Sequence, residues 1–144
     1  MTLQTPLTKS EVAAIQGSFA RLVPKADDLA REFYDRLFRD NPSVRSLFPS
    51  DMTSQREKLV STLAFVVRGL GDISQIEDAV KSLGVRHRGY KAVPDHYMAV
   101  GAALLATLEA RLGSLWTPEL AQAWKKAYGV VAKTMIDAAN NRAA

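Results

Sequence analysis

Apolar residues recur along the chain at intervals of three and four positions, the spacing of one face of an α-helix. No segment alternates apolar and polar residues for long enough to predict a β-strand. Prolines, glycines and helix-capping residues divide the pattern into separate segments. The sequence therefore predicts an all-α domain with six main helices and a short third helix.

The expected helix boundaries follow from capping and breaking residues. Thr8 and Glu11 form a capping-box pattern before the first helix, and Ser74 and Glu77 form a second one. Asn41-Pro42 ends the second helix, and Gly113 ends the fifth. After the first helix, the main helices are expected at about 25–39, 51–70, 75–88, 94–112 and 118–139, with the short one at 44–48.

Composition indicates an ordinary globular domain. The 144 residues fit one domain, 1–144, and the absence of cysteine excludes disulfides, thiolate metal sites and iron–sulfur clusters. The net charge of +4 is spread along the chain, which disfavours nucleic-acid binding. No run approaches the roughly 18 apolar residues of a membrane span, so we expect a cytoplasmic protein without membrane insertion.

Two helices each carry one polar residue on an apolar face. Gln55 lies four positions before Leu59, and His87 lies four after Leu83. Each also has an ordinary interpretation, as a half-buried polar residue or as a core or capping histidine, and periodicity does not decide between them. With two histidines and no cysteine, a site of several protein ligands is disfavoured. A porphyrin supplies four ligands, so one well-placed histidine suits a haem.

Three groups of motifs then resemble a known family. They are Phe33–Phe38 with Asn41–Phe48, Lys81–His87 with His96–Leu105, and Ala123–Val130. In this order they resemble bacterial flavohaemoglobin-type globins, especially single-domain ones such as the Vitreoscilla type and those of thermoacidophilic methanotrophs. The likeness spans about 11–136 and implies a globin fold around one haem b (iron protoporphyrin IX).

The resemblance implies a role for particular residues. His87 matches the proximal iron ligand, and Tyr97 matches a tyrosine beside it. Tyr34 and Gln55 match the distal residues that donate hydrogen bonds to a bound gas. The other haem contacts that it implies are Phe48, Lys58, Leu59, Leu63, Leu83, Arg86 and Val93.

Some of these contacts have competing interpretations. Lys58 falls where a basic residue often reaches a haem propionate. Arg86 and Arg88 are further propionate partners, or else solvated charges at a helix end. Leu59, beside Gln55, would exclude water together with Phe48.

Two departures from the flavohaemoglobin pattern affect the expected function. The chain ends at Ala144, so no reductase domain is expected and turnover would need an external electron donor. The glutamate that the family pairs with the proximal histidine is replaced by Ala139, and Asp137 lies about 200° around the helix from it. Its loss favours reversible binding over fast redox chemistry.

The leading hypothesis is therefore a haem protein that binds O₂, and also NO and CO, reversibly at a pentacoordinate iron. Gln55 is a poor iron ligand, which would leave the sixth position open. The alternatives are a nitric oxide dioxygenase served by an external reductase, a gas sensor acting through a partner, and a haem-free helical module. A monomer and a homodimer stay equally open.

Overall fold

The structure is a computed structural model that describes residues 7–89 and 94–143. The described residues form six α-helices and four 3-10 segments, and no strand occurs among them. The prediction of an all-α domain is confirmed, and the short third helix is the 3-10 segment Pro42–Leu47. The helices are α1 (Lys9–Leu22), α2 (Ala26–Asp40), α3 (Thr53–Gly69), α4 (Glu77–Gly89), α5 (Pro94–Leu112) and α6 (Pro118–Ala143).

The capping box at the start of α1 forms as predicted. The backbone N–H of Glu11 donates to Thr8 Oγ1 at 3.1 Å, and the N–H of Thr8 donates to the Glu11 carboxylate at 2.9 Å. The second predicted box is wrong, because α4 begins at Glu77 and not at residue 75. Ser74 instead donates its hydroxyl to Asp72 at 2.6 Å, within the 3-10 segment Leu70–Gln75.

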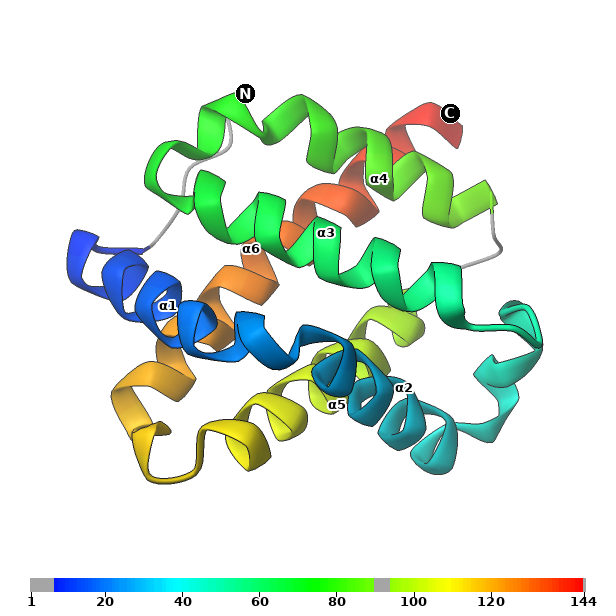
Figure 1. Ribbon diagram of the computed structural model, residues 1–144. Coiled ribbons are helices and arrows are strands. Elements are labelled where there is room, and N and C mark those ends of the chain that lie inside the picture. Colours follow the sequence, from blue (N-terminus) through cyan, green and yellow to red (C-terminus); the bar gives the residue numbers. More distant parts are fainter. Residues whose placement is uncertain (1–6, 90–93, 144) are drawn as a thin grey trace.

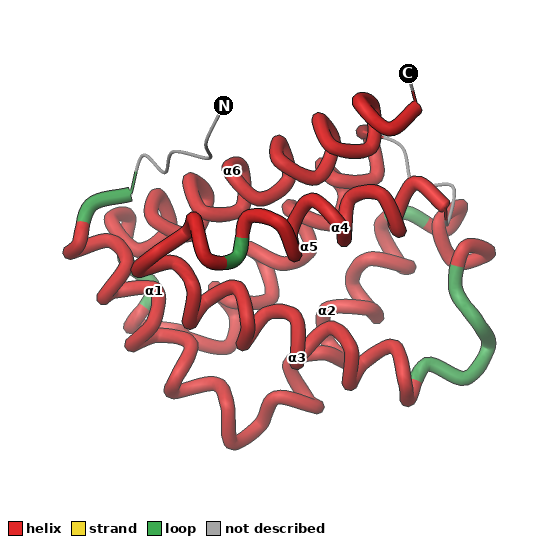
Figure 2. The backbone as a smooth tube through the Cα atoms, turned by 90° about the horizontal axis from the view of Figure 1, so that it is seen from above, coloured by secondary structure: helices red, strands yellow, loops and turns green. Residues whose placement is uncertain are grey.

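The helices pack in pairs around a common interior. Figure 1 shows α3 and α4 in the upper half of the molecule, α5 below, and α6 crossing behind them to the C-terminus. The extensive contacts are those of α4 with α6 and of α2 with α5, while α3 packs on α2 and α1. Figure 2 gives the same arrangement from above, with α4 running beside α6.

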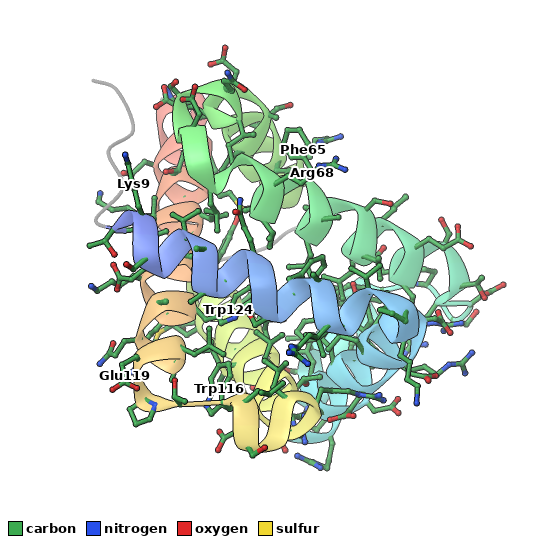
Figure 3. The ribbon with its side chains drawn as sticks, turned by 60° about the vertical axis from the view of Figure 1, so that its left-hand side comes forward. Lys9, Phe65, Arg68, Trp116, Glu119 and Trp124 are labelled. Carbon is green, nitrogen blue, oxygen red and sulfur yellow. The ribbon has the colours of Figure 1, made fainter. Side chains whose placement is uncertain are left out.

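Side chains of α1, α2, α5 and α6 make up most of the fully buried core. Ile15, Leu37 and Leu108 are each at most 1 % exposed. A buried polar bridge links α6 to α1: Trp124 Nε1 donates to Ser18 Oγ at 3.0 Å. Figure 3 shows Trp124 directed into this interior beneath α1. This packing fixes α2 and α5 as a framework for the remaining helices.

One described segment, Asp95–Leu115, is long and apolar enough to cross a membrane by length and composition alone. Core helices satisfy the same test, and the contacts of α5 are those of a core helix. It packs on α2 and α6, and Arg111 near its end pairs with Glu32 of α2 at 3.0 Å. The apolar character of α5 therefore follows from its place between two other helices.

Candidate functional site

Tyr34 lies on the buried face of α2, where the helix repeat places it with the apolar residues of the core. Its ring is 6 % exposed and meets Phe33 edge-on at a centroid distance of 4.8 Å. It also stacks on Phe38 at 5.8 Å and meets Phe48 edge-on at 5.6 Å. Aromatic pairs at these distances hold one another in place. The Tyr34 ring is therefore fixed on three sides, and only its hydroxyl is free to reach a ligand.

Gln55, in the first turn of α3, meets that hydroxyl. Its side-chain amide nitrogen donates to Tyr34 Oη at 3.3 Å. Tyr34 thus acts as an acceptor, and within the described chain its own O–H proton is given to no other residue. Burial raises the pKa of Tyr34, against a smaller opposite effect of the Gln55 amide. The phenol therefore keeps its proton at neutral pH and remains a hydrogen-bond donor.

Phe48 follows the 3-10 segment at the corner between α2 and α3. It packs on Phe38 at 5.3 Å as well as on Tyr34. Arg45 braces this corner, because its guanidinium lies 5.0 Å over the Phe38 ring and donates to the carbonyls of Phe48 and Pro49. A cation on an aromatic face and two backbone bonds together fix the corner. The half-buried ring of Phe48 is thus held beside the Tyr34–Gln55 pair.

The rest of α3 presents an apolar face that its neighbours cover only in part. Leu59 and Leu63 pack on the core but stay half-buried, and Val67 is the one fully buried residue of the helix. Lys58 is exposed and makes no ion pair with a described residue. Figure 3 shows Phe65 and Arg68 on the outer side of α3. This helix therefore keeps apolar surface that the described part of the chain does not cover.

The opposite side of the predicted site is built on α4. Gly84 lets α4 approach α6 closely, because a Cβ atom there would lie 2.1 Å from the Met135 carbonyl oxygen. Leu83 is half-buried and Arg86 is exposed. His87 lies in the last turn of α4, but its side chain, that of Arg88, and the whole of Val93 fall outside the described residues.

Tyr97, in the first turn of α5, is tied to α6. The Tyr128 hydroxyl donates to the backbone carbonyl of Tyr97, and the Tyr128 ring lies against Gly101. Burial raises the pKa of Tyr97, and burial together with the nearby Tyr97 raises the pKa of Tyr128. Both phenols are therefore neutral in the folded protein at ordinary pH. This side of the site carries hydrogen-bonding groups without a charge.

The end of α6 bears out the charge pattern expected there. Ala139 is buried at 8 % exposure. Asp137 is exposed and pairs with Lys133 of its own helix at 2.8 Å. Asp137 is therefore turned to solvent, and it does not take the place of a buried glutamate.

Sequence reasoning missed three contributors to this site. Phe38 packs on both aromatic residues of the corner, Arg45 braces that corner, and Tyr128 holds Tyr97. A helical spacing of four links Phe38 to Tyr34 and could have revealed it. Tyr128 acts on a residue 31 positions away, whereas Arg45 acts on Phe48, only three positions on, and no sequence pattern marked either one.

A surface pocket of about 200 Å³ lies elsewhere, between the start of α1 and the end of α3. None of its lining residues belongs to the predicted site. The lining is formed by Leu7, Thr8, Lys9, Val12, Ala13, Gln16, Leu70 and Gly71. Its position and mixed lining do not favour it over the Tyr34–Gln55 region.

The described residues thus combine six packed helices, a hydrogen-bonded pair of buried Tyr34 and half-buried Gln55, and an α3 face that is only partly covered. The sequence profile of the family described as Globin matches residues 31–135. That match covers well over half of the chain, and the chain therefore belongs to the globin family. Globins bind haem and, through it, small gases such as O₂.

Particular relatives sharpen this assignment. The chain is 31% identical over 135 residues to a flavohemoprotein of Bacillus subtilis, across 90% of its own length and 33% of that protein. It is 27% identical over 136 residues to a flavohemoprotein of Vibrio cholerae, across 91% of its own length and 34% of that protein. It thus spans about a third of these relatives.

A solved structure extends the comparison to the fold. The bacterial globin from Campylobacter jejuni superposes with a TM-score of 0.84 at 25% identity, covering 94% of this chain and 99% of that one. A haem needs mostly apolar surroundings and a small number of hydrogen-bond donors. The described residues supply both features. Phe48, Leu59 and Leu63 form half-buried apolar surface, and Tyr34 with Gln55 supplies neutral donors. The residues present therefore fit a haem.

Proposed function

We propose that this globin holds haem b through His87 and binds O₂ and other diatomic gases reversibly on the α3 side. The observation that supports it most directly is the pair of Tyr34, buried among aromatic rings with a phenol proton left to donate, and half-buried Gln55. When bound, haem supplies an iron that takes up a small gas. Gln55 is a poor iron ligand, so the position facing it would stay open.

The protein's own residues would then tune the bound gas. The Tyr34 hydroxyl and the Gln55 amide donate hydrogen bonds in a site from which Phe48 and Leu59 exclude water, and low polarity strengthens such bonds. On the other face, Leu83 and Tyr97 would line the haem, with Lys58 and Arg86 near its propionates. Neutral surroundings would keep His87 uncharged and able to bind iron.

The first test is the visible spectrum of the purified protein, oxidised, reduced with dithionite, and exposed to air or carbon monoxide. We expect an intense Soret band, a high-spin reduced form and a stable oxygenated form. His87→Ala should abolish the iron–nitrogen bond and lower haem content severalfold, whereas His96→Ala, which changes the other histidine, should not. Unchanged haem content in His87→Ala would defeat the assigned ligand.

Tyr34→Phe tests the distal pair. Losing one hydrogen bond to a polar ligand costs about 1.5–3 kcal/mol, so O₂ should dissociate roughly ten- to a hundredfold faster. Carbon monoxide, which is less polar, should respond far less. Stopped-flow mixing measures both rates, and equal changes for the two gases would argue against a donor role for Tyr34.

A second candidate activity is nitric oxide dioxygenation with an external reductase in the cytoplasm. The flavohemoprotein relatives, about three times the length of the matched region, favour it. The neutral end of α6, with Ala139 buried and Asp137 paired outward, favours reversible binding instead. Nitrate formation from NO and O₂, measured with and without an added reductase and NADH, would decide between the two.

A further inference from the structure

The two ends of α3 are attached to the rest of the protein in different ways. At its C-terminal end Val67 is buried, and Gln16 of α1 donates to the Val67 carbonyl at 3.0 Å. Across its first eight residues, Thr53–Val60, every side chain is half-buried or exposed. This first half of α3 therefore has little apolar burial to hold it in place.

Two consecutive residues provide the polar attachment of that first half to α2. Gln55 donates to Tyr34 Oη, and Arg56 Nε donates to Asp27 Oδ1 at 3.2 Å. Asp27 and Tyr34 are seven residues apart, two turns along one face of α2. A pair of adjacent side chains thus spans two turns of the neighbouring helix and fixes both the position and the direction of α3.

The Arg56–Asp27 contact has the features of a specific bridge. The Arg56 side chain is only 16% exposed, although it is charged and lies near the start of a helix, whereas its partner Asp27 is 58% exposed. The second carboxylate oxygen of Asp27 accepts from Arg31 at 3.3 Å, one turn further along α2. Arg31 therefore orients the Asp27 carboxylate from within α2, independently of its contact with α3. Hydrogen bonding to Arg56, followed by Arg31, holds the pKa of the Asp27 carboxyl below its usual range.

We propose that Arg56 and Asp27 are positioning residues, which hold the first half of α3 against α2 and so keep Gln55 beside Tyr34. This proposal rests on the proposed function in one respect: the Tyr34–Gln55 pair is taken to face the bound gas. Releasing the bridge frees the start of α3, separates the two donors part of the time, and opens the path by which a gas enters and leaves.

The experiment compares Asp27→Asn, Arg56→Gln and the double variant with the unaltered protein. Lys126→Gln is the matched control, because Lys126 bridges α6 to Glu11 of α1 at 2.9 Å and does not touch α3. Amide hydrogen exchange is followed by mass spectrometry in peptides covering 53–60 and, for reference, 118–139. Carbon monoxide rebinding after a laser flash and O₂ dissociation are measured on the same samples.

We expect exchange in 53–60 to accelerate about three- to tenfold in both single variants and to stay unchanged in 118–139. Carbon monoxide rebinding should accelerate by a similar factor, and the double variant should equal each single one, because either change breaks the same bridge. Lys126→Gln, whose own ion pair links α6 to α1, should leave exchange in 53–60 and the rate of carbon monoxide rebinding unchanged. In 1 M salt the unaltered protein should approach the variants, which should respond less, because salt screens the ion pair.

Unchanged exchange in 53–60 in both variants would overturn the proposal, and so would an equal acceleration in 118–139. Additive effects in the double variant would equally contradict a shared bridge. If the protein carried no haem, the proposed function would fail on its own, and the exchange measurement, repeated on the haem-free chain, would still decide whether the bridge holds α3. If exchange accelerates but gas kinetics do not, the bridge holds α3 without positioning Gln55, and the proposal fails.

Discussion

Helices α2 and α3 are similar in length and lie side by side, yet they are buried to very different degrees. The 15 residues of α2 include five that are fully buried, whereas the 17 residues of α3 include only Val67. Both helices carry enough apolar residues for several of them to be fully buried. The difference shows that the described protein contacts cover the apolar face of α2 but leave that of α3 half-covered, where the proposed haem would lie.

The physical basis of this difference is the identity of the neighbours. The α2 helix packs on α5, where Arg36 donates to the fully buried Thr107 at 2.8 Å, and its apolar face is thereby sealed. Among the described elements, the main contacts of α3 are with α1, α2 and the segment that follows it. Leu59 and Leu63 consequently remain half-buried in the protein alone. A flat apolar cofactor would remove that surface from water.

The largest expected effect contrasts one leucine from each helix. Leu37→Ala, at a position 1 % exposed, should lower the free energy of unfolding by about 2–5 kcal/mol with or without haem. Leu63→Ala should cost about 1 kcal/mol or less in the haem-free protein and clearly more in the haem-loaded one. Urea unfolding of both forms measures this, and equal costs for the two leucines without haem would contradict the comparison.

A middle-sized effect is expected where α4 crosses α6. Gly84→Ala places a methyl group against the Met135 backbone, which should cost about 1–3 kcal/mol and shift the helix that carries His87. The control is Gly17→Ala in α1, where nothing lies within 4 Å of the new Cβ, so stability should rise by about 0.5–1 kcal/mol. Thermal unfolding and the rate of haem transfer to an acceptor globin check both changes. A Gly84→Ala protein as stable as its parent would mean that the crossing is looser than described.

The smallest effect is a loss of stability that should appear only at alkaline pH. It concerns Tyr34, which joins α2 to α3 through Gln55. Burial raises the pKa of Tyr34 above its ordinary 10.0, so the unfolded chain loses this proton first. The tyrosine therefore costs no stability below pH 10, and the folded state loses stability as the pH rises from there through the folded pKa. Tyr34→Phe should flatten part of this alkaline loss, with Tyr97 and Tyr128 responsible for the rest. If the stability of the variant and the parent fell identically with rising pH, Tyr34 would be exposed to water in the folded protein.

Much of the helical framework could be predicted from local sequence. The capping box at Thr8 and Glu11 and the stop at Gly113, whose φ is +55°, depend on residues within a single turn. The box predicted at Ser74 failed because Leu70–Gln75 forms a 3-10 segment with a non-helical residue at Asp72, and α4 begins only at Glu77. A capping pattern indicates which side chain can accept from the backbone at a helix start. The conformation of the preceding segment decides whether the helix begins there.

The candidate site was predicted less completely. Gln55 was first marked by its place on an apolar helix face, Tyr34 and Phe48 came from a resemblance, and the structure brings these three side chains together. It does not link them to Leu83 or Tyr97 by any contact described. Arg56 and Tyr128 were missed because each acts on a partner that is adjacent only after folding, and Arg45 was missed although its partner Phe48 lies three residues away.

The sequence by itself determined the class of fold, the places where helices begin and end, and the residue types available for a haem site. Those properties depend on backbone and side-chain preferences that act over one or two helical turns. Only the tertiary structure decided which apolar faces are sealed and which are left half-covered. It also decided that Gln55 meets Tyr34 and that Gly84 lies against Met135. Such contacts join residues 21 and 51 positions apart, and packing among helices sets them.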